Sequence, residues 1–276
     1  MQFAQGGGKM SIMEEGLTTQ IIRDPSVRLV GRLTIDESEL AGFLEDEGVA
    51  SWRTDAEVAG EKLVEVAGRL CYKSYAKPRP GGNAAYLGHI LEVGHGSVIE
   101  HAVYNFIITG VSRSFTHELV RHRAGFAYSQ RSQRFVDEKD CAFVEPDPIA
   151  EDPELHQIWL DAVVAAHAAY ARLAEGLTAK FSSIEDKTLR RKKAREAARS
   201  ILPNATETQI FVTANARALR HFIEARGDAS ADAEIRKVAI AMLRILQAES
   251  PNLFGDYQIV DLPTGGQTVT TPYRKV

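Results

Sequence analysis

The centre of the chain reads Arg121-His122-Arg123-Ala124-Gly125-Phe126-Ala127-Tyr128-Ser129-Gln130-Arg131-Ser132-Gln133-Arg134-Phe135. This stretch combines four arginines and one histidine with two serines, two glutamines and three aromatic residues. Arginine presents a planar fork of donors that suits phosphate or carboxylate, and serine and glutamine add neutral hydrogen-bonding groups. Desolvated binding sites select arginine and aromatic residues. The stretch therefore predicts a surface that binds a phosphorylated small molecule, with a solvated charged loop as the alternative.

The residues before this stretch predict a strand followed by a helix. Apolar side chains alternate along residues 102–109, as on one face of a strand, and after Gly110 they recur every four residues, as on one face of a helix. The strand face consists of Tyr104, Phe106 and Ile108, and the helix face of Val111, Phe115 and Leu119. The arginine stretch would begin at the C-terminal end of that helix, where cations are favourably placed.

The remaining pattern predicts an α+β protein. Asp152-Pro153 is an N-cap followed by proline at the first helical position, so it predicts the start of a long helix. Further helices are predicted over residues 55–71, 84–93, 187–199, 215–226 and 232–249, and further strands over 27–35 and 208–214. Residues 77–83, with two prolines and two glycines, predict a loop. The absence of a Gly-x-Gly-x-x-Gly turn and of strand-helix alternation argues against a Rossmann domain.

Composition and charge are those of an ordinary globular protein. Of the 276 residues, 44% are hydrophobic and 25% charged, and the formal charge is −4, which argues against a dedicated nucleic-acid binder. No apolar run reaches the roughly 20 residues that span a bilayer, and the N-terminus lacks a signal-peptide pattern, so we expect a cytoplasmic protein. We expect residues 1–20 to form a flexible extension, 21–260 a single catalytic domain, and 261–276 a polar, poorly ordered tail.

The chain has two cysteines, Cys71 and Cys141, which excludes a disulfide framework and a cysteine-rich metal site. Cys71 follows a helical apolar pattern, so we expect it to be a small buried residue. The face of that helix would consist of Val58, Leu63, Val66, Ala67 and Leu70. Cys141 follows an acidic, turn-like segment and has no activating neighbour in sequence.

Three separated blocks resemble the flavin-dependent thymidylate synthases (ThyX). They are Gly94-His95-Gly96-Ser97 with Glu100-His101, then Arg121-His122-Arg123 with Ser132-x-Arg134, then Asn215-x-Arg217 with Arg226. The likeness covers roughly residues 67–254. Some positions depart from the family pattern: eight residues, 124–131, stand where the family commonly has seven. Gln130 stands where relatives often have glutamate, Glu118 where several have glutamine, and His221 where others have asparagine.

The resemblance implies an α+β single domain in which a β-sheet is flanked by long helices. It also implies a methyltransferase that converts dUMP to dTMP by reductive methylation. Methylenetetrahydrofolate would supply the carbon, and FAD would relay electrons from NADPH. The family assembles as a homotetramer with active sites shared between subunits, and the resemblance implies the same assembly here.

Family roles are carried over residue by residue. The residues that would bind dUMP are Glu118, Arg121, Gln130, Arg131, Ser132, Gln133, Arg134, Arg199 and Arg226. The residues that would bind FAD are His95, Ser97, Glu100, Arg121, His122, Arg123, Gln130, Asn215, Arg217 and His221. Arg226 matches the arginine that polarises the uracil ring, so it is the expected catalytic residue. For Arg217, a structural ion pair with Glu234 is the alternative.

The residue types agree with this chemistry. Adding a carbon at uracil C5 requires electron density there, and a cation near the N3/O2 edge of the ring stabilises the anion that supplies it. An unrelated class of thymidylate synthase uses cysteine attack at C6, which demands a thiolate in an electropositive pocket. Neither cysteine lies in a motif block, so we expect a mechanism without an enzyme nucleophile. Ser132 has no evident His-Asp partners, and a hydrogen bond to the nucleotide explains it more simply.

Two other readings are weighed against this one. A metal site could use His95, His101, His117 and His122, but no His-Glu-x-x-His pattern or cysteine pair supports it, and we expect no metal. A nucleic-acid binding module could use the arginine stretch together with Arg190 to Arg195. That reading leaves the Gly94–His101 block unexplained, so we interpret residues 190–195 as a solvated helix face.

Overall fold

A computed structural model describes residues 3–6, 9–14, 17–77 and 80–276 of the chain. These residues form two compact units, which are described separately below. Unit 1 consists of residues up to Ser26 together with Ile108–Leu119 and Ser129–Ile210. Unit 2 consists of Val27–Ile107, Val120–Tyr128 and Phe211–Val276. The extent of a catalytic domain over residues 21–260 stays a prediction.

Unit 1 contains a four-stranded sheet. Its strands are β1 (Phe3–Gly6), β2 (Lys9–Glu14), β3 (Leu17–Ile22) and β7 (Ala142–Val144), in the order β1-β2-β3-β7. The first three strands pair antiparallel, and β7 pairs parallel with β3, with Phe143 opposite Ile21. Strands therefore occupy described residues within the N-terminal segment for which the sequence predicts a flexible extension.

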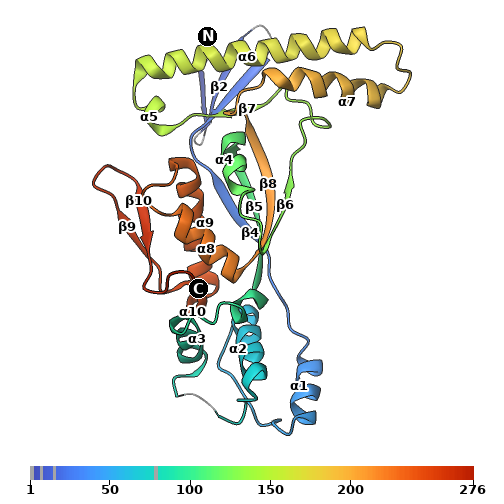
Figure 1. Ribbon diagram of the computed structural model, residues 1–276. Coiled ribbons are helices and arrows are strands. Elements are labelled where there is room, and N and C mark those ends of the chain that lie inside the picture. The colour runs from blue at the N-terminus through green and yellow to red at the C-terminus, as the bar shows by residue number, and fades with distance from the viewer. Residues whose placement is uncertain (1–2, 7–8, 15–16, 78–79) are drawn as a thin grey trace. The chain divides into compact units, whose positions relative to one another are not determined.

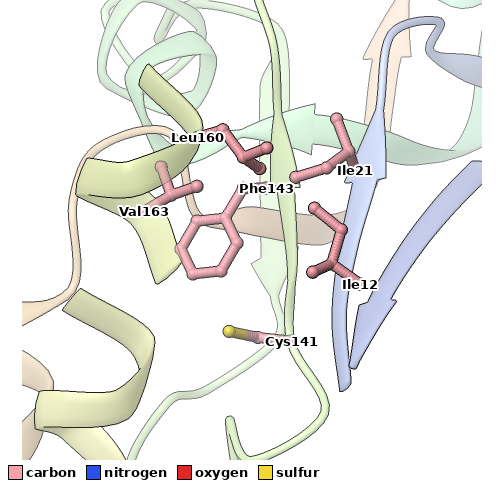
Figure 2. Packing of buried hydrophobic residues seen from close by; sticks show 6 residues of the cluster. All are labelled: Ile12, Ile21, Cys141, Phe143, Leu160 and Val163. Carbon is pink, nitrogen blue, oxygen red and sulfur yellow. The ribbon is translucent and has the colours of Figure 1, made fainter. Parts of the chain in front are cut away.

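Unit 1 also contains helices. They are α4 (Arg113–Leu119), α5 (Asp147–Ala150), α6 (Pro153–Lys180), α7 (Lys187–Ala198) and the short η2 (Arg199–Ile201). The predicted cap of α6 is confirmed, because the Asp152 carboxylate accepts hydrogen bonds from the backbone N–H groups of Glu154 and Leu155. α6 and α7 lie side by side (Figure 1). A core formed by Ile12, Ile21, Cys141, Phe143, Leu160 and Val163 joins α6 to the sheet (Figure 2).

A second sheet has the strand order β4-β5-β8-β6. Its strands are β4 (Ser26–Gly31), β5 (Val103–Ser112), β8 (Glu207–Asn215) and β6 (Phe126–Gln130). The boundary between the two units falls within these strands. The predicted alternation along β5 is confirmed, since Tyr104, Phe106 and Ile108 are buried and the residues between them are half-buried.

The helices of unit 2 and its strand pair complete the fold. The helices are α1 (Glu37–Asp46), α2 (Ala59–Tyr72), α3 (Gly82–Glu92), η1 (Val98–His101), α8 (Ala216–Arg226), α9 (Ala233–Glu249) and α10 (Pro251–Phe254). Strands β9 (Gln258–Asp261) and β10 (Gln267–Thr270) pair antiparallel. The α+β class expected from the sequence is confirmed.

The predicted apolar face of α2 is wrong for the most buried positions, although Val66 packs against the cluster of Leu44, Trp52 and Tyr75. The buried residues of this helix are Gly60, Glu61, Val64, Glu65, Gly68 and Arg69, whereas Leu70 and Cys71 are exposed. The cause is a buried polar network. Glu65 pairs with Arg69 at 2.7 Å and accepts a hydrogen bond from Asn83. The Arg69 guanidinium and the Asn83 amide therefore compensate the charge of the buried Glu65 carboxylate.

Three other segments differ from expectation or extend it. The acidic stretch after β4 forms α1, whose N-terminus is capped by the Asp36 carboxylate. The C-terminal segment contains β10, and Val269 and Val276 within it are buried, so it is not poorly ordered. In the predicted loop over residues 77–83, Pro78 and Arg79 lie outside the described residues, and α3 begins at Gly82.

Candidate functional site

The arginine stretch divides between the two units. α4 ends at Leu119, residues up to Tyr128 belong to unit 2, and residues from Ser129 belong to unit 1. Most residues expected to bind dUMP lie in unit 1: Glu118, Gln130, Arg131, Ser132, Gln133, Arg134 and Arg199. Arg121, Arg226 and, apart from Gln130, the residues expected to bind FAD lie in unit 2.

The segment Arg131–Arg134, called the nucleotide loop here, follows directly after β6. Gln130, the last residue of β6, donates hydrogen bonds from Nε2 to the hydroxyls of Thr116 and Thr208, at 3.3 and 3.2 Å. The Ser132 hydroxyl accepts a hydrogen bond from the Arg134 backbone N–H at 3.3 Å, which turns the loop. Gln133 is only 6% exposed. The loop is therefore folded inward with its polar side chains partly desolvated.

Buried donors without a protein acceptor gather at this loop. Within the described ranges, six buried side-chain N or O atoms have no hydrogen-bond partner, and four belong here: Nε of Arg113, Arg131 and Arg134, and Nε2 of Gln133. Arg134 Nε lies 3.0 Å from Glu196 Oε2, but the geometry of this ion pair leaves the N–H without an acceptor. Buried donors without acceptors are rare in proteins and call for an explanation. A phosphorylated ligand would supply acceptors for the N–H groups of Arg113, Gln133 and Arg134.

Arg113 was not identified from the sequence, because it lies outside the three motif blocks. It is the first residue of α4, and its Nη2 donates to the Arg131 carbonyl oxygen at 3.3 Å. Burial lowers the pKa of Arg113, and the charges of Arg199 and Arg131 lower it further, while Glu138 opposes them. Positive charge is thus concentrated in a partly desolvated place, which favours an anion. A strand that runs directly into an arginine-led helix is the signal that could have found it.

The basic helix α7 holds the residues that follow the nucleotide loop. Arg195 donates to the Phe135 carbonyl oxygen at 2.9 Å and to Asp137 at 2.7 Å, and the Lys192 ammonium lies 4.8 Å from the centre of the Phe135 ring. The interpretation of residues 190–195 as a solvated helix face is therefore corrected for Lys192 and Arg195, which contact residues that follow the nucleotide loop. Sequence spacing alone cannot show these contacts, because the contacting residues are 57 to 60 positions apart.

In unit 2, His122 and Arg226 are in direct contact. Arg226 Nε donates a hydrogen bond to His122 Nε2 at 3.0 Å. The His122 ring also contacts the rings of Phe126, His221 and Phe222, with centroid distances of 6.0, 5.8 and 5.2 Å. The Tyr128 hydroxyl donates to the His122 carbonyl oxygen. The arginine expected to be catalytic is therefore oriented by a histidine of the signature triplet.

The protonation state of His122 follows from this packing. Burial lowers the pKa of His122 to about 4, with smaller contributions from the charges of Arg226, His221 and Arg121. His122 is therefore neutral near pH 7. Because Nε2 accepts from Arg226, the ring proton belongs on Nδ1. Protonation at Nε2 would abolish the hydrogen bond to Arg226.

A pH-dependent stability follows from the lowered pKa of His122. The unfolded histidine, with a pKa near 6.5, binds a proton more readily than the folded one. The contribution of His122 to the free energy of unfolding is therefore full above about pH 6.5 and is lost as the pH falls toward about 4. Urea unfolding at pH 7 and pH 5 should show a larger loss for the wild type than for His122→Gln, whose side-chain oxygen can still accept from Arg226. Equal losses would contradict the assignment.

The other residues expected to bind FAD surround the N-terminus of α8. Asn215 caps this helix, since its Oδ1 accepts from the Ala218 N–H at 2.8 Å. Arg217 pairs with Glu100 at 2.6 Å. Gly96 packs closely on Arg217, since a side chain there would lie 2.7 Å from Arg217 Nε. Two residues of the upstream block, Gly96 and Glu100, are thus brought to Arg217 of the downstream block. A helix N-terminus with an arginine and a glycine beside it fits a phosphate group.

His95 and Gly125 have local roles in this group. The His95 ring stacks on Tyr72 with a centroid distance of 6.0 Å. Gly125, within the eight-residue segment 124–131, has a φ of +74°, and a side chain there would lie 2.7 Å from Asn215 Nδ2. Glycine is required at such a position. Ser97, Arg121, Arg123 and His221 are exposed, and their proposed contacts with FAD stay predictions.

Comparisons with known proteins show the family to which the chain belongs. The family described as "Thymidylate synthase complementing protein" matches residues 55–252. A flavin-dependent thymidylate synthase of Mycobacterium sp. (strain JLS) is 55% identical over 227 residues, which cover 80% of this chain and 89% of that protein. One of Mycobacterium tuberculosis (strain ATCC 25618 / H37Rv) is 52% identical over 223 residues, covering 80% and 88%. The chain belongs to the flavin-dependent thymidylate synthase family.

The fold of this chain is similar to that of solved structures. The UMP/dUMP methylase PolB from Streptomyces cacaoi, solved with 5-Br dUMP, has a TM-score of 0.59 at 21% identity, covering 85% of this chain and 95% of that one. Its complex with 5-Br UMP has a TM-score of 0.58, with coverage of 85% and 94%. At this identity the likeness concerns the fold alone.

The cysteines of this family member do not lie in activating surroundings. Cys141 is 3% exposed and points into the apolar core of unit 1 (Figure 2). Burial, with the nearby Glu138 charge, raises the pKa of its thiol to about 12, which disfavours a thiolate. Cys71 lies on the exposed side of α2.

No group of three or more His, Cys, Asp and Glu side chains is arranged to hold a metal ion in the part of the chain that the structure covers. Among the helices described, none is both long and apolar enough to cross a membrane.

Proposed function

We propose that this chain catalyses the reductive methylation of dUMP to dTMP as a flavin-dependent thymidylate synthase. The observation that carries the proposal is the 52–55% identity, over 80% of the chain, to proteins of that name. The geometry supports it independently, because an arginine-rich loop with buried unpaired donors suits a nucleotide phosphate, and a second group at a helix N-terminus suits a dinucleotide cofactor.

In the nucleotide loop, the residues that would bind dUMP are Ser132, Gln133 and Arg134, together with Arg113 and Arg199. The unpaired N–H groups of Arg113, Gln133 and Arg134 would donate to the phosphate, and the Ser132 hydroxyl would add a neutral donor. Glu118 and Gln130 would lie at the edge of this site, as the family resemblance implies. The negative charge of Glu138 offsets only part of the positive charge of Arg113, Arg131 and Arg199. The remaining positive potential favours the binding of an anion.

The second group would bind FAD through His95, Ser97, Glu100, Arg121, His122, Arg123, Gln130, Asn215, Arg217 and His221. The flavin, when bound, supplies the redox chemistry, while the protein binds, orients and excludes water. We further propose NADPH as the reductant and methylenetetrahydrofolate as the carbon donor, as the family resemblance implies. The N-terminus of α8 with Arg217 fits the cofactor's phosphates, and the aromatic cluster around His122 fits a planar ring.

Arg226 would act on the uracil ring. A guanidinium at the N3/O2 edge lowers the energy of the ring anion from which C5 attacks the donated carbon, and its advantage is largest when the group is already oriented. His122 provides that orientation, because its neutral Nε2 accepts a hydrogen bond from Arg226 Nε. The C5 proton must leave during the reaction, so its release reports turnover.

A double cysteine variant tests the absence of an enzyme nucleophile. In Cys71→Ser/Cys141→Ser, we expect turnover within about threefold of the wild type, because neither thiol is placed for attack at C6. The buried Cys141 makes some loss of stability expected, so activity should be expressed per bound flavin. A loss of about 10³-fold or more per flavin would contradict the mechanism.

We also propose the homotetramer with shared active sites that the family resemblance implies. Exposed apolar side chains on α2 support an interface, since Leu70 is 51% and Tyr72 64% exposed in the single chain. Light scattering coupled to size-exclusion chromatography measures the mass of the assembly. A monomer at micromolar concentration would contradict this part of the proposal.

The absorption spectrum of the purified protein is the first test of the proposed function. An oxidised flavin gives two bands, in the near ultraviolet and in the blue, and NADPH should bleach the blue band. A colourless protein that takes up no added FAD would contradict the proposal. A flavoprotein that releases no C5 hydrogen from dUMP would keep the cofactor assignment and overturn the catalytic one.

A further inference from the structure

Arg131 is engaged by two buried carboxylates. Its Nη2 lies 3.0 Å from Glu207 Oε2 and 3.4 Å from Glu138 Oε2, and it donates to the Glu207 carbonyl oxygen at 2.9 Å. The two glutamates are 5% and 2% exposed. Buried carboxylates of this kind are tolerated only when they are paired. The Nη2 group of Arg131 is therefore committed to the protein, whereas its Nε is buried without an acceptor among the described residues. The family resemblance alone assigns this residue to the nucleotide.

Both carboxylates are held in place by other groups. Glu207 is the first residue of β8, and its Oε1 accepts from the Gly110 backbone N–H at 3.1 Å. The Glu138 backbone N–H donates to the Tyr170 hydroxyl at 3.3 Å, and its carbonyl oxygen accepts from His167. These attachments come from β5 and α6. The two glutamates that accept from Arg131 are consequently held in place by hydrogen bonds within unit 1.

The backbone of Arg131 is anchored as well. Its N–H donates to the Gln209 carbonyl oxygen at 2.9 Å, and its carbonyl oxygen accepts from Arg113 Nη2 at 3.3 Å. The next three residues are Ser132, Gln133 and Arg134. Side chain and backbone together therefore define where the nucleotide loop begins, and they also locate the guanidinium of Arg113.

We propose that Arg131 is a positioning residue, which acts through Glu207 and Glu138 and makes no contact with the nucleotide. This inference rests on the proposed function of the nucleotide loop. Arg131 holds the loop on β8, and its charge offsets two carboxylates that would otherwise attract Arg113 and repel a phosphate. Both effects act on nucleotide binding and neither on the flavin group.

A comparison of two variants distinguishes positioning from direct contact. In Arg131→Leu the two carboxylates lose their partner, and we expect the KM for dUMP to rise about tenfold or more while kcat per bound flavin stays within about twofold. Arg131→Leu/Glu138→Gln/Glu207→Gln removes the whole ionic cluster. Because replacing a buried ionic group completely is often tolerated, we expect its KM within about threefold of the wild type. A residue that contacts the nucleotide cannot be rescued in this way.

The controls make every outcome decisive. Arg172→Leu removes an exposed arginine of α6 and should leave the KM unchanged. The shift in melting temperature caused by dUMP gives a second readout that does not need turnover. If Arg131→Leu does not fold, the triple variant decides alone: a KM near the wild type supports positioning, and a tenfold rise overturns it. A wild type without dUMP-dependent turnover would instead refute the proposed function, whatever the variants show.

Discussion

Arg226→Ala should lower kcat by about 10²–10³-fold and leave the bound flavin near one per chain, because the interaction lost is one that strengthens as charge develops on the uracil ring. Arg226 is oriented by its hydrogen bond to His122, so the charge is in place before the reaction begins. Turnover is measured as release of the C5 hydrogen, and flavin content is measured from the absorption spectrum. Together they separate a loss of turnover from a loss of bound flavin. Loss of flavin together with turnover would mean that Arg226 belongs to the cofactor site.

Arg217→Ala is the matched control for this prediction. It also removes one arginine from α8, but this arginine lies at the N-terminus of the helix, paired with Glu100 and packed on Gly96. We expect weaker flavin binding and, once FAD is saturating, turnover closer to the wild type. The opposite pattern in the two variants would reverse the assigned roles.

Arg226→Ala should also raise the pKa of His122, since the charge of Arg226 contributes to lowering it.

Arg134→Ala should raise the KM for dUMP by roughly 10- to 100-fold, the equivalent of a lost charge-assisted hydrogen bond to a phosphate worth about 1.5–3 kcal/mol. Its Nε is buried without an acceptor within the described residues, which marks it as a donor available to a ligand. Steady-state kinetics with dUMP varied and the other substrates saturating measure the effect. We expect flavin content to be unchanged.

Glu196→Gln is the control for the Arg134 prediction. It keeps Arg134 and removes only the charge of its partner, in an ion pair whose side chains are 39% and 51% exposed. Exposed pairs of this kind contribute little, so the KM should change by less than about threefold. If Arg134→Ala behaves like Glu196→Gln, Arg134 makes no contact with the phosphate.

Elements with local signals were predictable from the sequence. The start of α6 follows from the Asp152-Pro153 cap, α8 from Asn215, and β5 from strict alternation, because each signal acts within a few residues. The face of α2 was not predictable. Its buried side carries Glu65 and Arg69, and an apolar pattern cannot show that a polar network formed with a residue 18 positions away occupies the interior.

The sequence predicted which residues form the candidate site better than it predicted how their side chains are arranged. The motif blocks identified His122 and Arg226, and the structure brings their side chains into contact although they are 104 residues apart. The blocks did not identify Arg113, and they did not indicate that Arg131 faces Glu207. Sequence patterns identify which residue types occur together, whereas the direction of a long side chain depends on carboxylates that approach from distant strands and loops.

Release of tritium from [5-³H]dUMP tests the central claim most directly. The purified flavoprotein, supplied with NADPH and methylenetetrahydrofolate, should release tritium to water in parallel with formation of dTMP, and Arg226→Ala with its flavin bound should release almost none. A wild-type protein that carries flavin and oxidises NADPH, yet neither releases the C5 hydrogen nor forms dTMP, would contradict the account.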